Sequence, residues 1–322
     1  MNAPLVSIIC LCYNHALFLR EALDSVLAQT YPHLEILVVD DLSTDDSVTI
    51  IEEYTHRFPQ IRFIKHAQNI GNCASFNEAL QLSRGEFIID FATDDVLHPD
   101  RVAQQVAAFQ HLPETYGVVY TDAELIDEQG ASMGFFYKRP DSGKISPKPA
   151  KGDVFADVLG RYFICPPTMM MRRQVLEELQ GYDPLLAYED FDFWVRSSRN
   201  WHYFFLDQVL CQRRMHPHSL SRKVYQKGDK QLASTIQVIR KAQKLVRTHQ
   251  EKEALRNRIK YEARHAYLTA NYPEAGQLLQ VLEEEKGMAP LYRILQVLTQ
   301  KQVPLQFLRR WYHRWKYGHT AA

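Results

Sequence analysis

The feature that most constrains the fold is a regular alternation of apolar runs and amphipathic segments over residues 5–95. The first run, at 5–12, is continuously apolar, which is typical of a strand covered on both faces of a parallel sheet. Similar runs follow at 34–39, 61–65 and 87–91, and segments with helical spacing at 16–29, 47–56 and 73–83 separate them. This order predicts an α/β fold with a Rossmann-like, doubly wound, mostly parallel sheet and helices on both faces.

The rest of the chain continues this pattern and then changes. We expect a helix over 101–112 and a strand over 117–122. Residues 127–152 are rich in Gly and Pro, so we expect a long binding loop or lid there. Helical spacing dominates later on, which predicts a first domain at 1–225 and a helical, basic extension at 226–322.

Composition excludes several classes of protein. Apolar residues make up 46% and charged residues 24% of the chain, as in globular and not in disordered proteins. No apolar stretch reaches the roughly 18–20 residues of a membrane span, and the start lacks the basic region of a signal peptide. The five cysteines form no Cys-x-x-Cys pair, so we expect buried thiols in the cytoplasm rather than zinc ligands or disulfides.

The charges are unevenly distributed although they cancel over the whole chain. Residues 1–100 carry 5 Lys and Arg against 15 Asp and Glu, whereas residues 222–322 carry 20 against 8. An acidic first part suits a site for a divalent cation. A basic last part suits an anionic partner such as a membrane surface or a nucleic acid.

Several motifs of nucleotide and hydrolytic enzymes are absent from the sequence. It has no Gly-x-Gly, no P-loop, no Gly-x-Ser-x-Gly and no His-Glu-x-x-His. A bound nucleotide would therefore need a metal ion or basic side chains, and not a glycine-rich loop, to neutralise its diphosphate.

Two acidic groups directly follow predicted strands: Asp40-Asp41 and Thr93-Asp94-Asp95. Ligands of doubly wound sheets bind outside the carboxyl ends of the strands, so both groups are expected on one edge. Carboxylates with a diphosphate are the ligands that Mg²⁺ and Mn²⁺ prefer. The alternative is that these residues only cap the helices that follow.

The sequence also contains an ordered series of motifs that resembles glycosyltransferase family 2. The series covers roughly residues 4–222 and reads V-S-I-I-C-L-C-Y-N at 6–14, S-V-L-A-Q-T-Y-P at 25–32, V-V-D-D-L-S-T-D-D-S at 38–47, N-I-G-N at 69–72, R-G-E-F-I-I-D-F-A-T-D-D at 84–95, G-Y-D at 181–183, E-D-F-D-F-W-V-R at 189–196 and R-M-H-P-H-S-L-S at 214–221. The resemblance implies a GT-A fold and an inverting transfer of a hexosyl or hexosaminyl group from a nucleotide-diphosphate sugar to an acceptor hydroxyl.

The resemblance also implies a nucleotide-sugar site. Tyr13 and Asn14 would border the base, and a carboxylate of Asp40 or Asp41 would accept hydrogen bonds from the base or ribose. Because a carboxylate reads a uracil N–H well, we expect a UDP-sugar donor. The remaining predicted donor contacts are Asn77, Asp94 and Arg214.

A metal site is implied beside the diphosphate. The predicted ligands of Mn²⁺ or Mg²⁺ are Asp94, Asp95 and His216. Arg213 and Arg214 stand next to His216 in the sequence, and the planar fork of Arg suits phosphate. The alternative for this basic cluster is an exposed turn, because Pro217 follows it directly.

Asp190 is the predicted general base, with Glu189 as the alternative. An inverting transfer needs a group that takes the proton of the acceptor hydroxyl, and a carboxylate suits this role. The competing interpretation is that Glu189-Asp190 caps a helix over 191–199.

The sequence departs from the family pattern at several positions. The family often has Pro where Leu11 stands, Gly where Leu42 and Asp46 stand, and Asp where Ala92 stands. An Arg that is common before Asn77 is replaced by Phe76.

The last residues suggest contact with a membrane surface. Leu305–Gly318 combines apolar residues at helical spacing with Arg and Lys, as in a helix that lies on anionic lipid on the inner face of the plasma membrane. Packing on the catalytic domain is the alternative, and nucleic-acid binding is not expected. A sugar or lipid-linked sugar acceptor of lipopolysaccharide, capsule or exopolysaccharide synthesis would fit. The rival functions are a sugar nucleotidylyltransferase and a non-catalytic, sugar-binding scaffold.

Overall fold

The computed structural model describes residues 3–139, 145–217, 227–228 and 230–305. The Leu305–Gly318 segment therefore lies, apart from Leu305, outside the described residues. Contacts divide the chain into two compact units, Met1–Val154 with Phe163–Pro217 and Phe155–Tyr162 with His218–Ala322. The segment 155–162 thus belongs with the helical part of the chain, although it lies within 1–225.

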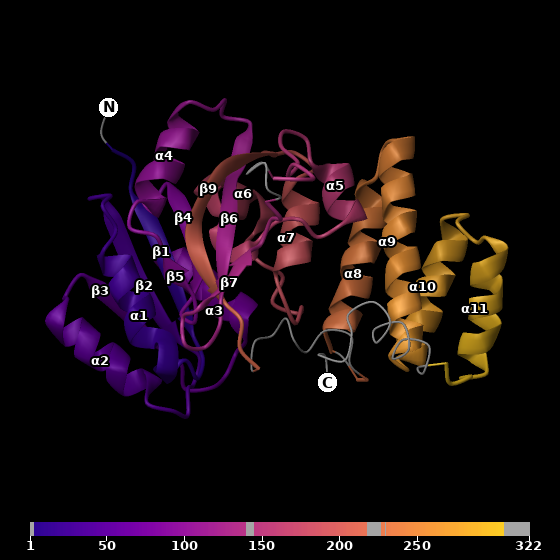
Figure 1. Ribbon diagram of the computed structural model, residues 1–322, viewed down its shortest axis with the longest axis horizontal. Coiled ribbons are helices and arrows are strands. Elements are labelled where there is room, and N and C mark those ends of the chain that lie inside the picture. The colour runs from indigo at the N-terminus through magenta and orange to yellow at the C-terminus, as the bar shows by residue number, and fades with distance from the viewer. Residues whose placement is uncertain (1–2, 140–144, 218–226, 229, 306–322) are drawn as a thin grey trace. The chain divides into compact units, whose positions relative to one another are not determined.

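The first unit is built on one mixed sheet (Figure 1). Its strand order is β3-β2-β1-β4-β8-β6-β9-β5, with β7 added to β6. The strands are β1 (Val6–Cys12), β2 (Leu34–Asp40), β3 (Ile61–Lys65), β4 (Phe87–Ala92), β5 (Val96–Leu97), β6 (Tyr116–Ile126), β7 (Ser132–Phe135), β8 (Met170–Arg172) and β9 (His202–Arg214). The four strands β3, β2, β1 and β4 are parallel, so their carboxyl ends lie on one edge.

Helices follow the parallel strands in the predicted order. They are α1 (Ala16–Leu27), α2 (Ser47–Arg57), α3 (Asn72–Leu82) and α4 (Arg101–Gln110), and later α6 (Arg173–Leu179) and α7 (Asp190–Ser197). The continuous apolar runs of β1 and β2 are buried on both faces, as a doubly wound sheet requires. The predicted α/β fold class is confirmed.

The two faces of the sheet are covered by different helices. One face packs Ile8, Val38 and Phe91 against buried residues of α1, α2 and α4. Because side chains alternate along a strand, the neighbours Ile9 and Asp90 point to the opposite face. This second face is the one on which α3 packs, through Phe76 and Ala79 among other buried residues.

Strand β9 is a feature that the sequence analysis did not predict. Its 13 residues read HYFFLDQVLCQRR, and their mixed burial shows no strict alternation of buried and exposed positions. The strand pairs with β6 in parallel and with β5 in antiparallel orientation. The Gly- and Pro-rich region 127–152 contains β7, which forms a hairpin with β6.

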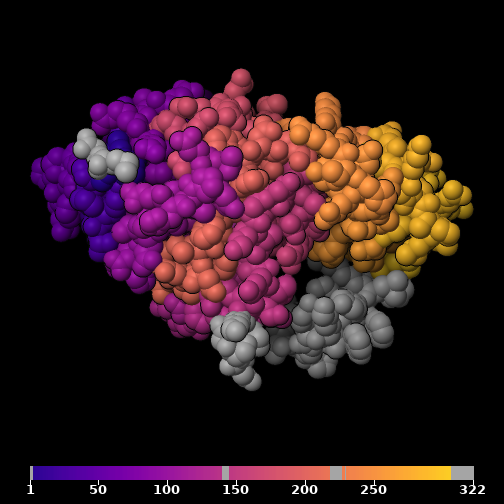
Figure 2. Space-filling view, turned by 90° about the horizontal axis from the view of Figure 1, so that it is seen from above, coloured from indigo at the N-terminus to yellow at the C-terminus, as the bar shows by residue number. Residues whose placement is uncertain are grey.

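The second unit consists of helices. They are α5 (Phe155–Gly160), α8 (Lys230–Leu245), α9 (His249–Leu268), α10 (Tyr272–Glu284) and α11 (Pro290–Gln300). Thr248 and Glu251 form a capping box that begins α9. The helices α8 to α11, in orange and yellow, make up most of the described atoms of this unit in the space-filling view (Figure 2). Among the described residues, none of the helices has the length and apolarity to span a membrane.

Candidate functional site

The predicted site residues gather at the carboxyl edge of the parallel strands. Register pairs Cys12 with Asp40 and Leu11 with Ala92, so β1, β2 and β4 end at the same level. The segments that follow these strands carry Tyr13 and Asn14, Asp41, and Thr93 to Asp95. Tyr13 is exposed there, whereas the acidic residues are mostly buried.

Asn14 ties the β1–α1 loop to the β2–α2 loop. Its backbone N–H donates to Ser43 Oγ at 2.9 Å, and its Oδ1 accepts from the backbone N–H of Thr44 at 2.7 Å. Asn14 has a φ of 57°, in the left-handed region that Asn tolerates. It therefore shapes the edge on which Tyr13 lies.

Asp40 and Asp41 are both buried but differ in their partners. Asp40 Oδ2 accepts from the Ser43 backbone N–H at 2.9 Å, and Asp40 Oδ1 has no hydrogen-bond partner among the described residues. Asp41 accepts from the backbone N–H groups of Ile70 and Gly71, both at 2.8 Å, and lies 2.9 Å from His66 Nδ1. Asp41 therefore fastens the segment before α3 to the edge.

Asp94 forms a polar group with two histidines. His216 Nε2 lies 3.0 Å from Asp94 Oδ2, and His15 Nδ1 lies 2.9 Å from the Thr93 hydroxyl. Burial alone would raise the pKa of Asp94, but the contact with His216 and the nearby charge of His15 leave it below its usual value. Asp94 is thus held ionised.

The pKa of Asp95 is shifted in the opposite direction to that of Asp94. Burial and the adjacent charge of Asp94 raise the pKa of Asp95 well above its usual value. Its Oδ1 accepts from the backbone N–H of Arg214 at 2.8 Å. The pairing of β5 with β9 brings these two residues together.

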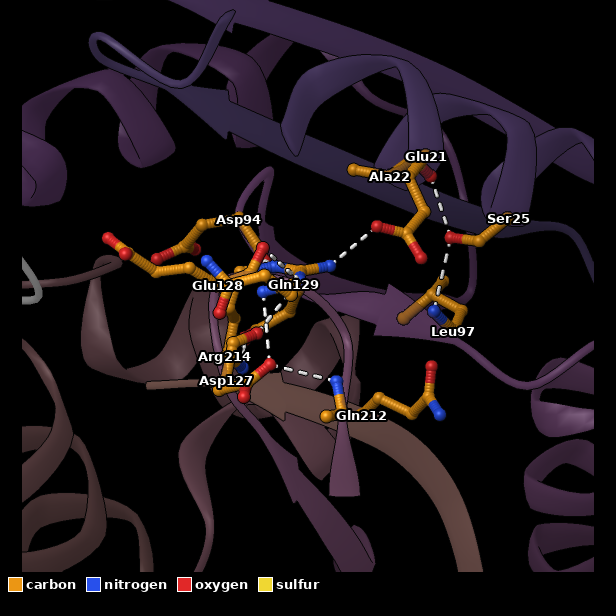
Figure 3. A network of polar contacts seen from close by, with 12 residues as sticks. Glu21, Ala22, Ser25, Asp94, Leu97, Asp127, Glu128, Gln129, Gln212 and Arg214 are labelled. Carbon is orange, nitrogen blue, oxygen red and sulfur yellow. Dashed lines mark hydrogen bonds and ion pairs between the residues drawn. The ribbon is translucent and has the colours of Figure 1, made fainter. Parts of the chain in front are cut away.

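Arg214 is the centre of a polar network on this edge (Figure 3). Its guanidinium donates to the backbone oxygens of Asp94 and Asp127 and pairs with Glu21 Oε2 at 2.6 Å. The guanidinium carbon also lies 4.7 Å from the centre of the Phe18 ring. The side chain is almost fully buried, so these contacts already use most of its donors.

Arg213 occupies a different environment from its neighbour. It is half-buried, and the charges of Asp95 and Asp190 act on it together with the thiol of Cys165. Burial would lower the pKa of Arg213, but these neighbours raise it. Arg213 is thus kept positively charged, and the carboxyls of the acidic edge and of the predicted base both act on it.

Glu189 and Asp190 lie at the start of α7. Glu189 Oε2 accepts from Asn72 Nδ2 at 2.7 Å, and Asp190 Oδ1 is buried without a hydrogen-bond partner among the described residues. Burial, and then the charge of Glu189, raise the pKa of Asp190 well above its usual value, while Arg213 lowers it in part. Burial also raises the pKa of Glu189.

Asn77 holds the turn that precedes these carboxyls. Its amide donates to the carbonyl of Tyr182 and accepts from the backbone N–H of Tyr182, both at 2.8 Å. Arg196 of α7 donates to the carbonyl of Gly181 and pairs with Asp192 at 2.6 Å. The side chain of Asn77, predicted to contact the nucleotide, is therefore engaged with the backbone.

Two hydrogen bonds and the charge of Arg213 connect the edge with the base candidates. Asp41 binds the backbone of Gly71, and the next residue, Asn72, binds Glu189. On the other side, the charge of Arg213 acts on both Asp95 and Asp190. Acidic groups that are far apart in the sequence are thus related through Asn72 and through the charge of Arg213.

The capping alternatives do not match these contacts. The N-cap residues of α2, α4 and α7 are Asp46, Asp100 and Glu189, and none of them makes a side-chain capping hydrogen bond. Asp40 instead binds Ser43 within the same loop, and Asp41 binds the segment before α3.

No complete metal-binding group is preassembled in the described part of the chain. Groups of three His, Cys, Asp or Glu side chains that could hold a metal ion are absent there. The carboxylates of Asp94 and Asp95 are nevertheless the hard oxygen donors that Mg²⁺ and Mn²⁺ prefer. These donors fit a cation that takes its remaining ligands from a diphosphate or water.

Two residues outside the predicted site belong to this region. His15 acts on Asp94, but it follows Tyr13-Asn14 without a spacing that would distinguish it in the sequence. Asp90 stands inside the apolar run of β4; the charge of Glu189 acts on it, and its own charge acts on Asp190. The one signal in the sequence that could have identified Asp90 is an acidic residue within an otherwise apolar predicted strand.

Comparison with known proteins shows a family match. A model described as glycosyl transferase family 2 matches residues 7–180. Relatives include uncharacterized glycosyltransferases of Rickettsia felis, 32% identical over 69% of this chain, and of Methanocaldococcus jannaschii, 30% identical over 67%. The putative glycosyltransferase EpsE of Bacillus subtilis is 32% identical over 61% of this chain.

These relatives differ in length from the chain. The matched region is 36% of the Rickettsia felis protein, 65% of an uncharacterized glycosyltransferase of Rickettsia typhi, 72% of the Methanocaldococcus jannaschii protein and 67% of EpsE.

Solved structures share the fold at low sequence identity. TarS of S. aureus, residues 1–349 in complex with UDP-GlcNAc, has a TM-score of 0.70 and 17% identity, with 97% of this chain and 93% of that chain covered. The mannosyltransferase PcManGT from Pyrobaculum calidifontis, in complex with GDP-Man and Mn²⁺, has a TM-score of 0.58 and 17% identity, with 94% and 86% covered. The expected GT-A fold is confirmed.

Proposed function

Because the chain belongs to glycosyl transferase family 2, we propose that it transfers a sugar from a nucleotide-diphosphate sugar to an acceptor hydroxyl with inversion. The single observation that carries this proposal is the convergence of three acidic groups on one region. Asp41, Asp95 and Asp190 come from three separate segments, and the Asn72–Glu189 hydrogen bond together with the charge of Arg213 supports their convergence.

The nucleotide would lie at the edge formed by the ends of β1 and β2. Tyr13 is exposed there and offers a ring to the base. A donor group of the base or ribose would bind Asp40 Oδ1, or the remaining lone pair of Asp41 Oδ2. Such a carboxylate contact favours UDP over nucleotides that present no ring N–H at this position.

A divalent cation would be held by Asp94 and Asp95, with His216 beside them. When bound, the cation offsets the negative charge that develops on the departing diphosphate. Asp94 is kept ionised by its neighbours, which suits a ligand role. Arg213, which has fewer structural contacts than Arg214, is the better-placed cation for the diphosphate.

Asp190 would take the proton of the acceptor hydroxyl. Its unpartnered Oδ1 is an acceptor with no competing donor among the described residues. A base with a raised pKa holds the transferred proton more firmly and works best near neutral pH. Glu189, held by Asn72, would orient the pair.

The basic residues at the end of the chain suggest a biological setting for this transfer. A hexose or hexosamine acceptor of lipopolysaccharide, capsule or exopolysaccharide synthesis, free or lipid-linked, suits the basic final hundred residues. Contact of 305–318 with the inner face of the plasma membrane would bring the enzyme to a lipid-linked acceptor.

The test is turnover of UDP- and GDP-sugars by the full chain, with Mn²⁺, with Mg²⁺ and with a chelator. We expect slow release of UDP from one UDP-sugar in the presence of metal. In Asp190→Asn this slow donor hydrolysis should remain, whereas sugar transfer to a matching acceptor should be strongly reduced. Formation of nucleotide sugars from sugar phosphates would show a nucleotidylyltransferase instead. No turnover, with sugar binding intact, would show a scaffold.

A further inference from the structure

His66 is a buried histidine at the acidic edge to which the proposed function gives no role. It directly follows β3, as Asp41 directly follows β2, and its backbone N–H donates to the carbonyl of Asp40 at 3.0 Å. This hydrogen bond extends the parallel pairing of Asp40 with Lys65 by one residue. The register of the two strands therefore brings the ring of His66, of which only 7% is exposed, beside Asp41.

Each ring nitrogen of His66 lies next to a carboxylate. Nδ1 is 2.9 Å from Asp41 Oδ1, and Nε2 is 3.2 Å from Glu78 Oε2 of α3, an ion-pair distance without regular hydrogen-bond geometry. The hydroxyl of Ser75, also in α3, is a more distant neighbour at 3.5 Å from Nδ1. Because an ionised carboxylate only accepts hydrogen bonds, the hydrogen between His66 and Asp41 belongs to Nδ1.

The hydrogen bonds to Asp41 use its two oxygens unequally. An ionised carboxylate offers about four acceptor positions, two on each oxygen. Oδ1 accepts from the backbone N–H of Ile70 at 2.8 Å and from His66 Nδ1, whereas Oδ2 accepts from the backbone N–H of Gly71 at 2.8 Å. Counting donors from the described residues, both positions of Oδ1 are thus used, and Oδ2 keeps one position for a further donor.

We propose that His66 is a positioning residue that sets which oxygen of Asp41 binds the nucleobase. Its Nδ1–H occupies Oδ1 and leaves Oδ2 as the acceptor for one ring N–H, and Glu78 keeps the imidazole turned toward this contact. Without His66, two backbone N–H groups alone would hold the carboxylate, and a ring N–H would no longer meet a fixed acceptor. The inference rests on the proposed function, since it takes the base of the donor to lie at Asp41.

The test compares the affinities of the full chain for UDP and for N3-methyl-UDP, which lacks the ring N–H, by titration calorimetry in Mn²⁺. We expect the wild type to bind UDP at least about tenfold tighter, the effect of one hydrogen bond to a charged group. His66→Asn and His66→Gln are a matched pair, because the same amide takes the place of Nδ1 in the first and of Nε2 in the second. The Asn variant should keep the preference for UDP, whereas the Gln variant should reduce it to within about threefold.

His56→Asn is the control, since it makes the same change at an exposed position of α2 and should leave both affinities as they are. Thermal unfolding of all variants separates positioning from stability. An equal preference for UDP in the Asn and Gln variants of His66, even with lowered melting temperatures, would show that His66 is merely structural and would overturn the inference.

The proton NMR signal of the Nδ1–H of His66 gives a readout that needs no nucleotide. We expect a slowly exchanging, downfield signal in the wild type, which His66→Asn removes and His56→Asn retains; its absence from the wild type would overturn the inference. Equal binding of UDP and N3-methyl-UDP by the wild type would also overturn it, while the proposed function would stand. If the wild type binds neither nucleotide, the proposed function fails, and the NMR signal still decides whether His66 donates to Asp41.

Discussion

At the level of single residues, two acidic side chains of α7 have surroundings that suit different roles. Asp190 is half-buried beside Glu189, and its buried Oδ1 has no hydrogen-bond partner among the described residues. Asp192, two residues on, pairs with Arg196 at 2.6 Å. The first arrangement is suited to receiving a proton and the second to holding structure.

Substitution of the two residues should separate these tasks. We expect Asp190→Asn to lower kcat by about 10²–10⁴, the range for loss of a general base. The pKa of Asp190 is raised in the folded state, so the protonated carboxyl stabilises the fold at acid pH and this contribution is lost as pH rises through that pKa. Asp190→Asn should therefore melt no lower than the wild type, and it should melt at a higher temperature than the wild type at alkaline pH.

Asp192→Asn is the matched control on the same helix. It should lower the free energy of unfolding by about 1–3 kcal/mol, because it leaves the half-buried Arg196 without its ion pair. Urea unfolding and steady-state kinetics measure both effects. Normal turnover in Asp190→Asn would remove the base assignment.

Leu42 shows how a departure from the family pattern is expressed in the backbone. The family often has Gly at this position, and the structure places Leu42 at a φ of 65° and leaves its side chain exposed. A left-handed backbone conformation lowers the stability of the folded protein by about 1–2 kcal/mol for a residue other than Gly. Gly instead lowers stability by about 0.4–1 kcal/mol, because the unfolded chain has more conformations to lose at a Gly.

Leu42→Gly should therefore raise the free energy of unfolding by about 0.5–1 kcal/mol. Leu185 is an exposed Leu outside the positive-φ positions, and Leu185→Gly should lower stability by a similar amount. Equal losses in both variants, measured by urea unfolding, would show that the backbone at Leu42 is not strained.

At the scale of elements, the sequence predicted the parts whose pattern is local. The parallel strands and their helices follow from apolar runs and helical spacing, and the acidic pairs follow from the ends of those strands. Strand β9 has no such pattern, because its burial depends on β6 and β5, which lie far away in the chain. The surroundings of Arg213, which lies in β9, depend on this same long-range pairing and could not be predicted from spacing.

The turn at Gly181 connects α6 to the segment that leads to Glu189 and Asp190 at the start of α7. Gly181 has a φ of 78°, and a Cβ atom there would lie 2.3 Å from Asn77 Oδ1. Gly181→Ala should therefore lower the free energy of unfolding by about 1–3 kcal/mol. Gly276 in α10 has open space around it, and Gly276→Ala should raise stability by about 0.5–1 kcal/mol.

Thermal and urea unfolding of both glycine variants measure these effects. Because Asn77 binds the backbone of Tyr182, loss of the turn should also reduce turnover in Gly181→Ala. A variant as stable and active as the wild type would mean that the turn does not hold the site.

At the scale of the whole molecule, the separation of charge is the main feature beyond the fold. The first hundred residues are acidic and the last hundred are basic. If residues 305–318 contact a membrane, the full chain should bind vesicles that contain anionic lipid, and binding should weaken with salt.

A chain that ends at Leu305 should lose most of this binding while keeping its melting temperature. Vesicles of neutral lipid are the control and should bind neither form. Vesicle co-sedimentation measures both. Equal binding by the two forms would assign the contact to another part of the chain.

If the acidic edge is a cation-assisted site for a nucleoside diphosphate, UDP should bind the full chain more tightly in Mn²⁺ than in a chelator. Titration calorimetry of UDP under both conditions, with Asp94→Asn as the variant, measures this difference. We expect binding at least about tenfold tighter in Mn²⁺, a difference of about 1.4 kcal/mol, and loss of that difference in Asp94→Asn. Equal affinity with and without the cation, or no binding of UDP at all, would contradict it.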